Sequence, residues 1–367
     1  MNQTGIKTGN SGVFVVLLAL LFAATTTVNA DEVQKIGTTS MQSLKISTSA
    51  RAIGMGETYV ATADDIQSIF WNPAGLIHLE GTTAYFAQIN MPADIQFNAA
   101  AVAYNLGRKG VLGVHLLALT TNDMPVRTIY APEGTGENFM AYDIVTGVSW
   151  AQRLTDRFIF GCNLRLAMSG MDDAKYTGVL ADIGTLYETS LRTLKIGMAV
   201  QNFGPDVKYS GHYLDYLDQG RRARSDPQQG DYTGAPPPTI YRLGLSANLF
   251  QMTGLTPPAN WDGIVAVEMS HPNDNRERMN LGLEMEYMKI FALRAGYKLH
   301  FKNVLGYDEE RYTVGFGLKI PIPGLVVMGQ RATTVVFDYA FMDFGKIYEA
   351  SNDFMSRPHR FSLAVNF

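Results

Sequence analysis

The chain has 367 residues and a formal net charge of −4, without a sustained basic stripe, which argues against nucleic-acid binding. A single cysteine, Cys162, excludes an internal disulfide. Beyond the N-terminal region no uncharged apolar run approaches ~18 residues, so helical membrane spans are excluded. The hydrophobic content of 46% and a mean hydropathy of −0.02 fit a soluble protein, and fit equally a barrel whose apolar and polar residues alternate.

Residues 1–30 are typical of a secretory signal peptide. Lys7 precedes an apolar run over Val13–Ala24, and Val28-Asn29-Ala30 supplies the small residues that a signal peptidase reads. The run has twelve residues, fewer than the ~20 needed to span a bilayer. This length favours cleavage after Ala30 over the alternative, a membrane anchor.

Residues 31–80 do not alternate like a strand. Thr62 or Asp64 is placed to cap a short helix, and Pro73 disfavours helical geometry at the residue before it. A short amphipathic helix with a proline exit fits a plug folded back into a barrel. It fits equally an extension resting on the first strand. The apolar face of this helix comprises Ile66, Ile69 and Phe70.

Residues 81–367 contain about fourteen stretches in which apolar and polar residues alternate. In Tyr241–Leu249 and Tyr312–Ile320 the period of two holds over nine residues, about the length that a tilted membrane strand needs. Connections alternate between short, as in 107–110, and long, as in 204–240. We therefore predict an all-β fold, a transmembrane antiparallel β-barrel of about 14 strands with an N-terminal plug or hatch segment.

The chain ends on an alternating strand, Arg360–Phe367. In water such a strand would be an open edge, whereas a closed barrel in lipid pairs it on both sides. The terminal Phe367 resembles the C-terminal insertion signal of bacterial outer-membrane barrels, which implies that location and outer-membrane lipids as neighbours. The parity of the connections places this end in the periplasm. Periplasmic turns of such barrels are expected to be short, but connections 251–262 and 321–332 on that side are long. They are either genuine excursions of the chain or a sign that the strands are misplaced.

The face predicted to line the lumen carries charges of both signs. Because buried charges must be paired, one interpretation is a structural ion-pair network. The alternative is a polar conduit or a peptide-binding surface. A wide diffusion pore is disfavoured because the N-terminal segment would block it. The selected lumen charges are Arg165, Asp182, Arg242, Glu284, Arg294, Arg311 and Asp338.

The long connection 204–240 is rich in tyrosine and arginine, which anchor protein partners. A second interpretation is that these arginines lie near the outer leaflet and bind lipopolysaccharide phosphates. The third is that the loop is simply solvated. The candidate partner contacts are Tyr213, Tyr216, Arg221, Arg222 and Arg224.

Catalysis finds little support in the sequence. The six histidines are scattered without metal-ligand spacing, and no G-x-S-x-G elbow is present. We expect a protein that is not an enzyme and uses no cofactor or metal.

The segment from Ser49 to Leu76 resembles the signature of the PorV/PorQ family of outer-membrane barrels, and more distantly the hatch of FadL-type transporters. The resemblance implies that the segment plugs the lumen, and it extends to 132–137 and 201–205. Glu57 departs from the family pattern, which continues with a second small residue, and this puts close backbone packing there in doubt. The plug motif comprises Arg51, Gly54, Met55, Gly56, Asp64, Asp65, Trp71, Asn72, Pro73, Ala74 and Gly75.

Three functions follow from these patterns. The resemblance favours a barrel that binds cargo or secretion-system proteins in type IX secretion-like export. The second is a FadL-like channel for hydrophobic small molecules, for which a kinked strand beside an apolar pocket would be diagnostic; Gly315 and Gly317 are consistent with such a kink. The third is a structural barrel that supports the cell envelope.

Overall fold

The computed structural model describes residues 37–91, 95–127, 130–191, 193–217, 223–300, 311–322, 326–327, 330–331, 334–342 and 359–367. The predicted signal peptide, residues 1–30, lies outside the described residues. No described helix is long and apolar enough to cross a membrane.

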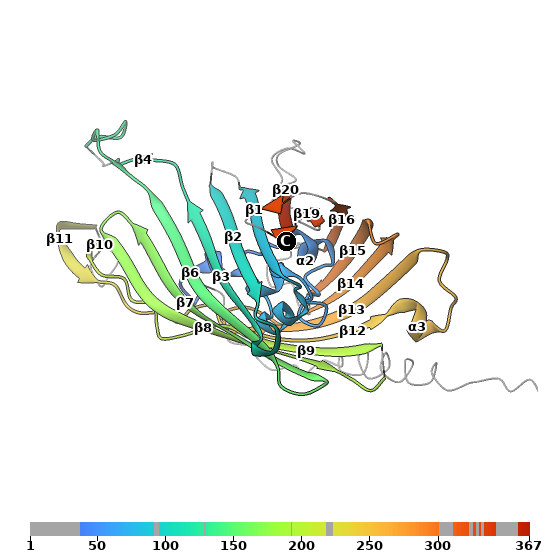
Figure 1. The fold of residues 1–367 in the computed structure, drawn as a ribbon. Coiled ribbons are helices and arrows are strands. Elements are labelled where there is room, and N and C mark those ends of the chain that lie inside the picture. The colour runs from blue at the N-terminus through green and yellow to red at the C-terminus, as the bar shows by residue number, and fades with distance from the viewer. Residues whose placement is uncertain are drawn as a thin grey trace, which may run out of the picture.

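Fourteen antiparallel strands form a closed barrel, in which the first strand, β1, pairs with the last, β20 (Figure 1). The predicted fold class is therefore confirmed. In barrel order the strands are β1 (Thr82–Asn90), β2 (Gln96–Asn105), β3 (Val111–Thr120), β6 (Ala141–Arg153), β7 (Phe158–Met171), β8 (Ala174–Glu188), β9 (Leu194–Phe203), β12 (Ile240–Asn248), β13 (Trp261–Pro272), β14 (Arg278–Tyr287), β15 (Phe291–His300), β16 (Tyr312–Pro321), β19 (Thr334–Met342) and β20 (His359–Asn366).

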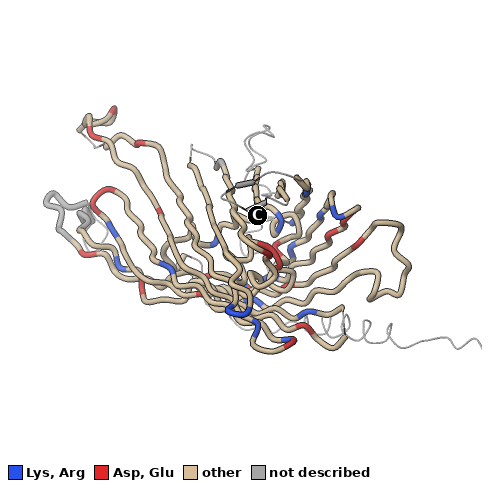
Figure 2. Tube along the Cα trace, viewed as in Figure 1, with Lys and Arg blue, Asp and Glu red and all other residues tan. Residues whose placement is uncertain are grey.

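Successive side chains on each strand point to opposite faces of the wall, as the period of two requires. On β7, Leu164 is 58% exposed whereas its neighbour Arg165 is 7% exposed. The large apolar side chains that the wall exposes include Val148, Leu243 and Leu293, whereas Arg242, Glu284 and Arg294 are buried. Figure 2 shows long uncharged stretches along the strands between charged ends. The wall therefore has apolar side chains on its outer face and polar side chains facing the lumen, as a membrane barrel requires.

Connection lengths divide the barrel into two ends. The turn end holds 107–110, 154–157 and the C-terminal Phe367, while the loop end holds 121–140 and 204–239. Short helices and paired strands occur within the connections (Figure 1). The two long connections of the turn end, 251–262 and 321–332, are genuine excursions, because the first begins within the helix α3 and the second contains the strand pair β17–β18. These elements are β4 (Met124–Pro125), β5 (Asn138–Phe139), β10 (His212–Leu217), β11 (Ala223–Asp231), α3 (Leu249–Thr253), β17 (Val326–Val327), β18 (Gln330–Arg331) and the 3-10 turn η4 (Gly107–Lys109).

Residues 37–81, here called the leader, form short helical turns inside the ring of strands (Figure 1). The predicted cap at Thr62 or Asp64 is wrong by at least one residue, because the carboxylate of Asp65 accepts the Gln67 N–H and begins the turn there. Asn72 caps the turn that starts at Pro73. The elements are η1 (Gln42–Lys45), α2 (Ala50–Gly54), η2 (Ile66–Phe70) and η3 (Pro73–His78).

The leader crosses the lumen from the loop end to the turn end. At the loop end the Thr39 hydroxyl donates to Asp274 at 2.5 Å, and the Ser40 N–H donates to the Pro236 carbonyl. At the turn end the Asn105 amide donates to the Leu79 carbonyl at 2.5 Å. Between these points the leader touches strands on every side of the ring. It therefore lies within the barrel rather than against one outer strand.

Candidate functional site

The leader backbone rests on a belt of inward-facing glycines. A methyl group at Gly296 would overlap the backbone of Gly56, and one at Gly161 would overlap the backbone of Pro73 and Ala74. Glycine is required at these positions because the leader approaches too closely for a Cβ atom. The belt comprises Gly161 on β7, Gly184 on β8, Gly197 on β9, Gly244 on β12, Gly282 on β14, Gly296 on β15 and Gly315 on β16.

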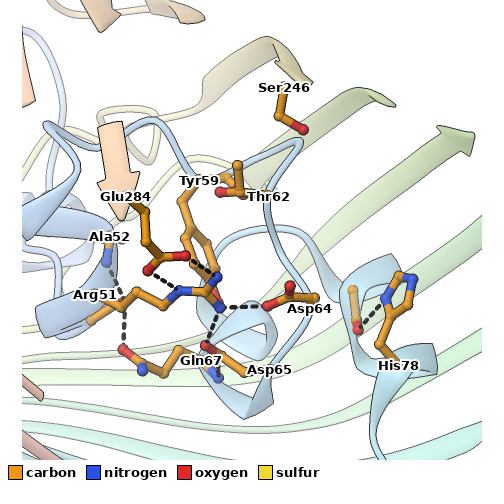
Figure 3. A network of polar contacts seen from close by, with 12 residues as sticks. Arg51, Ala52, Tyr59, Thr62, Asp64, Asp65, Gln67, His78, Ser246 and Glu284 are labelled. Atoms are coloured by element: carbon orange, nitrogen blue, oxygen red, sulfur yellow. Dashed lines mark hydrogen bonds and ion pairs between the residues drawn. The ribbon is translucent and has the colours of Figure 1, made fainter. Parts of the chain in front are cut away.

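Arg51 is the centre of the polar contacts of the leader (Figure 3). Its guanidinium donates to both oxygens of Glu284 on β14, through Nε at 3.0 Å and Nη2 at 2.8 Å. The third nitrogen, Nη1, contacts Asp64 and lies 2.8 Å from Asp65. The guanidinium also lies 5.6 Å from the ring centroid of Tyr59. One cation thus joins two leader carboxylates to the wall.

The network continues across the wall to β19. Arg294 donates to Glu284 at 2.5 Å and to Asp338 at 2.7 Å. Asp338 also accepts from the Gln67 amide at 3.0 Å, and Gln67 in turn accepts from the Ser49 hydroxyl at 2.6 Å. The chain of contacts therefore starts and ends on the leader, and it fixes α2 and η2 against three strands.

A second buried pair holds the middle of the leader. Glu268 on β13 accepts the backbone N–H groups of Tyr59 and Val60, each at 2.8 Å. Its other oxygen lies 2.9 Å from Arg242, whose guanidinium is stacked 4.2 Å from the ring centroid of Trp71. The carboxylate is saturated by a cation and two backbone donors, which is the condition for burying a charge without a large penalty.

A third group lies within the wall. Arg165 donates to Asp182 at 2.6 Å, and Asp182 also accepts the Asn202 N–H at 2.7 Å. Asn202 has a φ of 58°, at a register shift between β8 and β9. The Asn163 amide bridges this group to the leader by donating to the Ile69 carbonyl at 2.8 Å.

The side of the lumen formed by β1, β2, β3 and β6 is mainly apolar. Phe97 on β2, Leu117 on β3 and Val145 on β6 belong to one buried cluster with Ile66 and Ile69 of the leader. The predicted apolar face of the η2 turn therefore meets an apolar wall, and the charged face of the leader meets a charged wall. This two-sided match fixes the rotation of the leader inside the barrel.

Glu57 holds a left-handed backbone conformation with a φ of 63° and pairs with Lys298 on β15 at 3.2 Å. Burial alone would raise the pKa of Glu57, but Lys298 and the arginines beyond it lower that pKa to about 2. From the sequence, a glutamate at this position put close packing of the leader backbone in doubt. Gly56 does pack directly on Gly296, and the side chain of Glu57 points away into the ion pair.

We expect acid to loosen the leader through Glu57. Its pKa is lower in the folded state than the ordinary 4.5, so its stabilisation is complete above pH 4.5 and is lost as pH falls toward 2. The midpoint of thermal unfolding of the purified protein, followed from pH 6 down to pH 2.5, measures this loss of stability. Glu57→Gln should lower the midpoint at neutral pH and converge with wild type in acid, while the exposed Asp156→Asn should follow wild type throughout. An unchanged pH dependence in Glu57→Gln would contradict the assignment.

The predicted site residues fall into distinct groups. Arg51, Asp64 and Asp65 join the ion-pair network, and Gly54 and Gly56 touch the glycine belt. The remaining plug positions are all buried: Met55, Trp71, Asn72, Pro73, Ala74 and Gly75. Of the lumen charges, six lie in the networks above: Arg165, Asp182, Arg242, Glu284, Arg294 and Asp338.

Arg311 lies apart, at the loop end, where its carbonyl accepts from the Lys298 N–H. Tyr213, Tyr216 and Arg224 lie in the β10–β11 hairpin, but their side chains are outside the described part of the chain. Arg221 and Arg222 lie outside the described residues altogether. The insertion role of Phe367 stays a prediction; its backbone pairs with Thr82.

Sequence reasoning overlooked the glycine belt and Gln67. The belt had a readable signal, since Gly244, Gly282, Gly296 and Gly315 occupy inward positions of strands with clear alternation. Gly315, taken as consistent with a strand kink, instead makes room for Gly54. Among the described residues, no group of three or more His, Cys, Asp and Glu side chains is arranged to hold a metal ion.

The family model described as "Type IX secretion system protein PorV" matches residues 29–215, half of the chain. This chain belongs to the PorV family. It is an outer-membrane β-barrel of that family, and the resemblance drawn from the leader motif is confirmed. Among curated proteins, none matches the sequence.

Solved structures of outer-membrane channels are similar to this PorV-family barrel, and one of them shares its fold with a TM-score above 0.5. The CymD monoaromatic hydrocarbon channel aligns with a TM-score of 0.52 at 13% identity, over 86% of this chain and 94% of that chain. A Pseudomonas aeruginosa FadL homologue aligns at 0.48 and 11% identity, over 87% of this chain and 98% of that chain. The Ralstonia pickettii toluene transporter TbuX aligns at 0.46 and 13% identity, over 86% and 95%. At such identities the likeness to CymD concerns the fold alone.

Proposed function

We propose that this PorV-family barrel conducts no solute and catalyses no reaction, and that it binds exported proteins at its loop end during type IX secretion. The observation that carries the proposal is the leader, which fills the middle of the lumen. It contacts both the charged and the apolar side of the wall, and its buried charges Arg51 and Glu57 are paired with the wall. A barrel closed in this way offers its ends, and not its interior, to large partners.

Protruding segments at the loop end supply a surface for such partners. The connection between β9 and β12 carries the β10–β11 hairpin, which extends beyond the wall (Figure 1). At its base Tyr209 contacts Tyr176 and Tyr232, with ring centroids 6.1 and 6.3 Å apart, and Lys208 is exposed. Tyrosines beside flexible cations are frequent anchors in protein interfaces. The usual orientation of outer-membrane barrels assigns this end to the cell surface.

Photocrosslinking in intact cells tests the proposal. A photoreactive residue at Lys208, on the loop end, should give covalent adducts with secreted or surface proteins. The same residue at Arg108, exposed at the turn end, serves as the matched control and should not give those adducts. Unchanged surface and secreted protein profiles after deletion of the gene would sink the proposal.

A hydrophobic channel is the second candidate, and one observation favours it. An apolar groove of about 430 Å³ opens on the outer face of β8, β9, β12 and β13, beside the register shift at Asn202. Ile183, Met198, Tyr241 and Leu243 line it. Uptake of a hydrophobic fluorescent compound into liposomes that contain the protein would support this function. Uptake equal to that of empty liposomes would remove it.

A further inference from the structure

Unsatisfied polar atoms gather on the inner wall near the loop end. Ser270 and Asn280 are 0% and 1% exposed, yet the Ser270 hydroxyl and both polar atoms of the Asn280 amide have no hydrogen-bond partner, and neither does Nε of Arg278. Leaving a buried polar group without a partner costs about 1–3 kcal/mol, so folded proteins seldom retain several together. The concentration of such atoms on two neighbouring strands indicates a site that something else completes.

These side chains form one contiguous patch. Ser270 on β13 lies directly across from Arg278 on β14, and Asn280 lies across from Lys298 on β15. Side chains opposite each other on neighbouring strands have Cβ atoms about 5 Å apart, and diagonal neighbours remain within reach of long side chains. We call Ser270, Arg278, Asn280 and Lys298 the loop-end patch.

The leader closes the patch on the side of the turn end. Glu57 pairs there with Lys298, and Gly56 rests on Gly296, one inward position further along β15. On the other side the patch meets the turn after β13, where Oδ1 of Asp274 is a further buried atom without a partner. Arg278 is only half-buried. The partly exposed Arg278 therefore lies on the loop-end side of the patch, and the Glu57–Lys298 pair lies on its turn-end side.

The charges of this region favour an anion. Lys298 pairs with Glu57 at 3.2 Å and Arg242 pairs with Glu268 at 2.9 Å. Arg278 is a third cation, close enough to act on Glu57, and its Nε has no partner. Among these five described side chains, three cations and two carboxylates leave one positive charge, which Arg278 carries.

The available donors match oxygen atoms of an anion. A guanidinium recognises carboxylate, phosphate or sulfate through paired N–H groups, and the Asn280 amide and Ser270 hydroxyl add two donors. The Asn280 and Asp274 oxygens accept, and so they suit an anion that carries an acidic proton. We propose that the loop-end patch is a binding site for a small oxyanion of the hydrogen phosphate type.

Titration of the purified protein with inorganic phosphate, in detergent and at constant ionic strength set by sodium chloride, tests this proposal. Calorimetry should show saturable binding, and Arg278→Gln should weaken it at least tenfold. Arg276→Gln, two residues away in the connecting turn, is the matched control and should bind as wild type does. Absence of saturable binding, or equal binding by Arg278→Gln, would overturn the assignment.

A measurement on wild type alone covers the case in which the variant fails to fold. Crystals soaked in arsenate, which mimics phosphate and scatters anomalously, should show a peak within hydrogen-bond distance of Arg278 and Asn280. Ordered water in that position, without an anomalous peak, would show that hydration alone satisfies the patch and would overturn the site.

Discussion

Replacing Arg51 with methionine should release the leader and open the barrel to ions. Methionine retains most of the buried volume, but Glu284, Asp64 and Asp65 lose the cation that all three contact. Removing one partner of a buried ion pair costs up to about 3–5 kcal/mol. The fully buried Glu284 keeps Arg294 as a partner, and Asp64 and Asp65 are partly exposed, so we expect a cost below that range but above that of an exposed pair. We expect a lower thermal midpoint, faster proteolysis within residues 37–81 and steady conductance in planar bilayers, and we expect no conductance from wild type.

Arg153→Met is the matched control for Arg51→Met. Arg153 also pairs with a glutamate, Glu188, but their side chains are 38% and 31% exposed. Pairs of this kind contribute about 0–1 kcal/mol because water screens them. The control should therefore keep the wild-type midpoint and remain closed. Equal behaviour of the two variants would show that the luminal network does not hold the leader.

Gly296→Ala should displace the leader from β15. The added methyl group would overlap the backbone N and Cα of Gly56, and neither backbone atom can rotate away as a side chain does. Overpacking of this kind typically costs about 1–3 kcal/mol. Gly56 itself has a φ of 68°, which leaves the turn little room to adapt. The expected result is a lower thermal midpoint, with new protease cleavage in the leader while the barrel stays intact on unheated gels.

Gly234→Ala controls for the substitution itself. Gly234 lies in a connection, where a methyl group would meet the nearest atom at 3.4 Å, an ordinary contact. It should behave as wild type. If Gly296→Ala melts and resists protease as Gly234→Ala does, the leader does not lie against β15 as described.

The wall of the barrel was predictable because the alternation of residues is enforced by lipid on one side and by the lumen on the other. Inward placement of Arg242, Glu284 and Arg294 follows directly from that period. The partners do not follow from it. Arg51 and Glu284 are separated by 233 residues, and a period of two assigns a face without assigning a depth in the barrel.

The leader was harder to predict, because its turns are determined by contacts with the wall. Asp65 and not Asp64 caps η2, and both carboxylates contact Arg51, so their spacing in sequence did not distinguish a cap from an ion-pair partner. The left-handed conformation of Glu57 is likewise held by Lys298 on a distant strand. Local propensity yields to tertiary contacts in such short turns.

Disulfide trapping between the leader and the wall tests the central claim most directly. Ile53 on α2 and Ala340 on β19 belong to one buried cluster, so we expect cysteines at both positions, with Cys162→Ser, to come close enough to form a disulfide. Oxidation of isolated outer membranes should link the pair nearly completely, as it links the paired wall positions Val314 and Phe341. Linkage of the wall pair without any linkage of Ile53→Cys to Ala340→Cys would show that the leader lies outside the lumen.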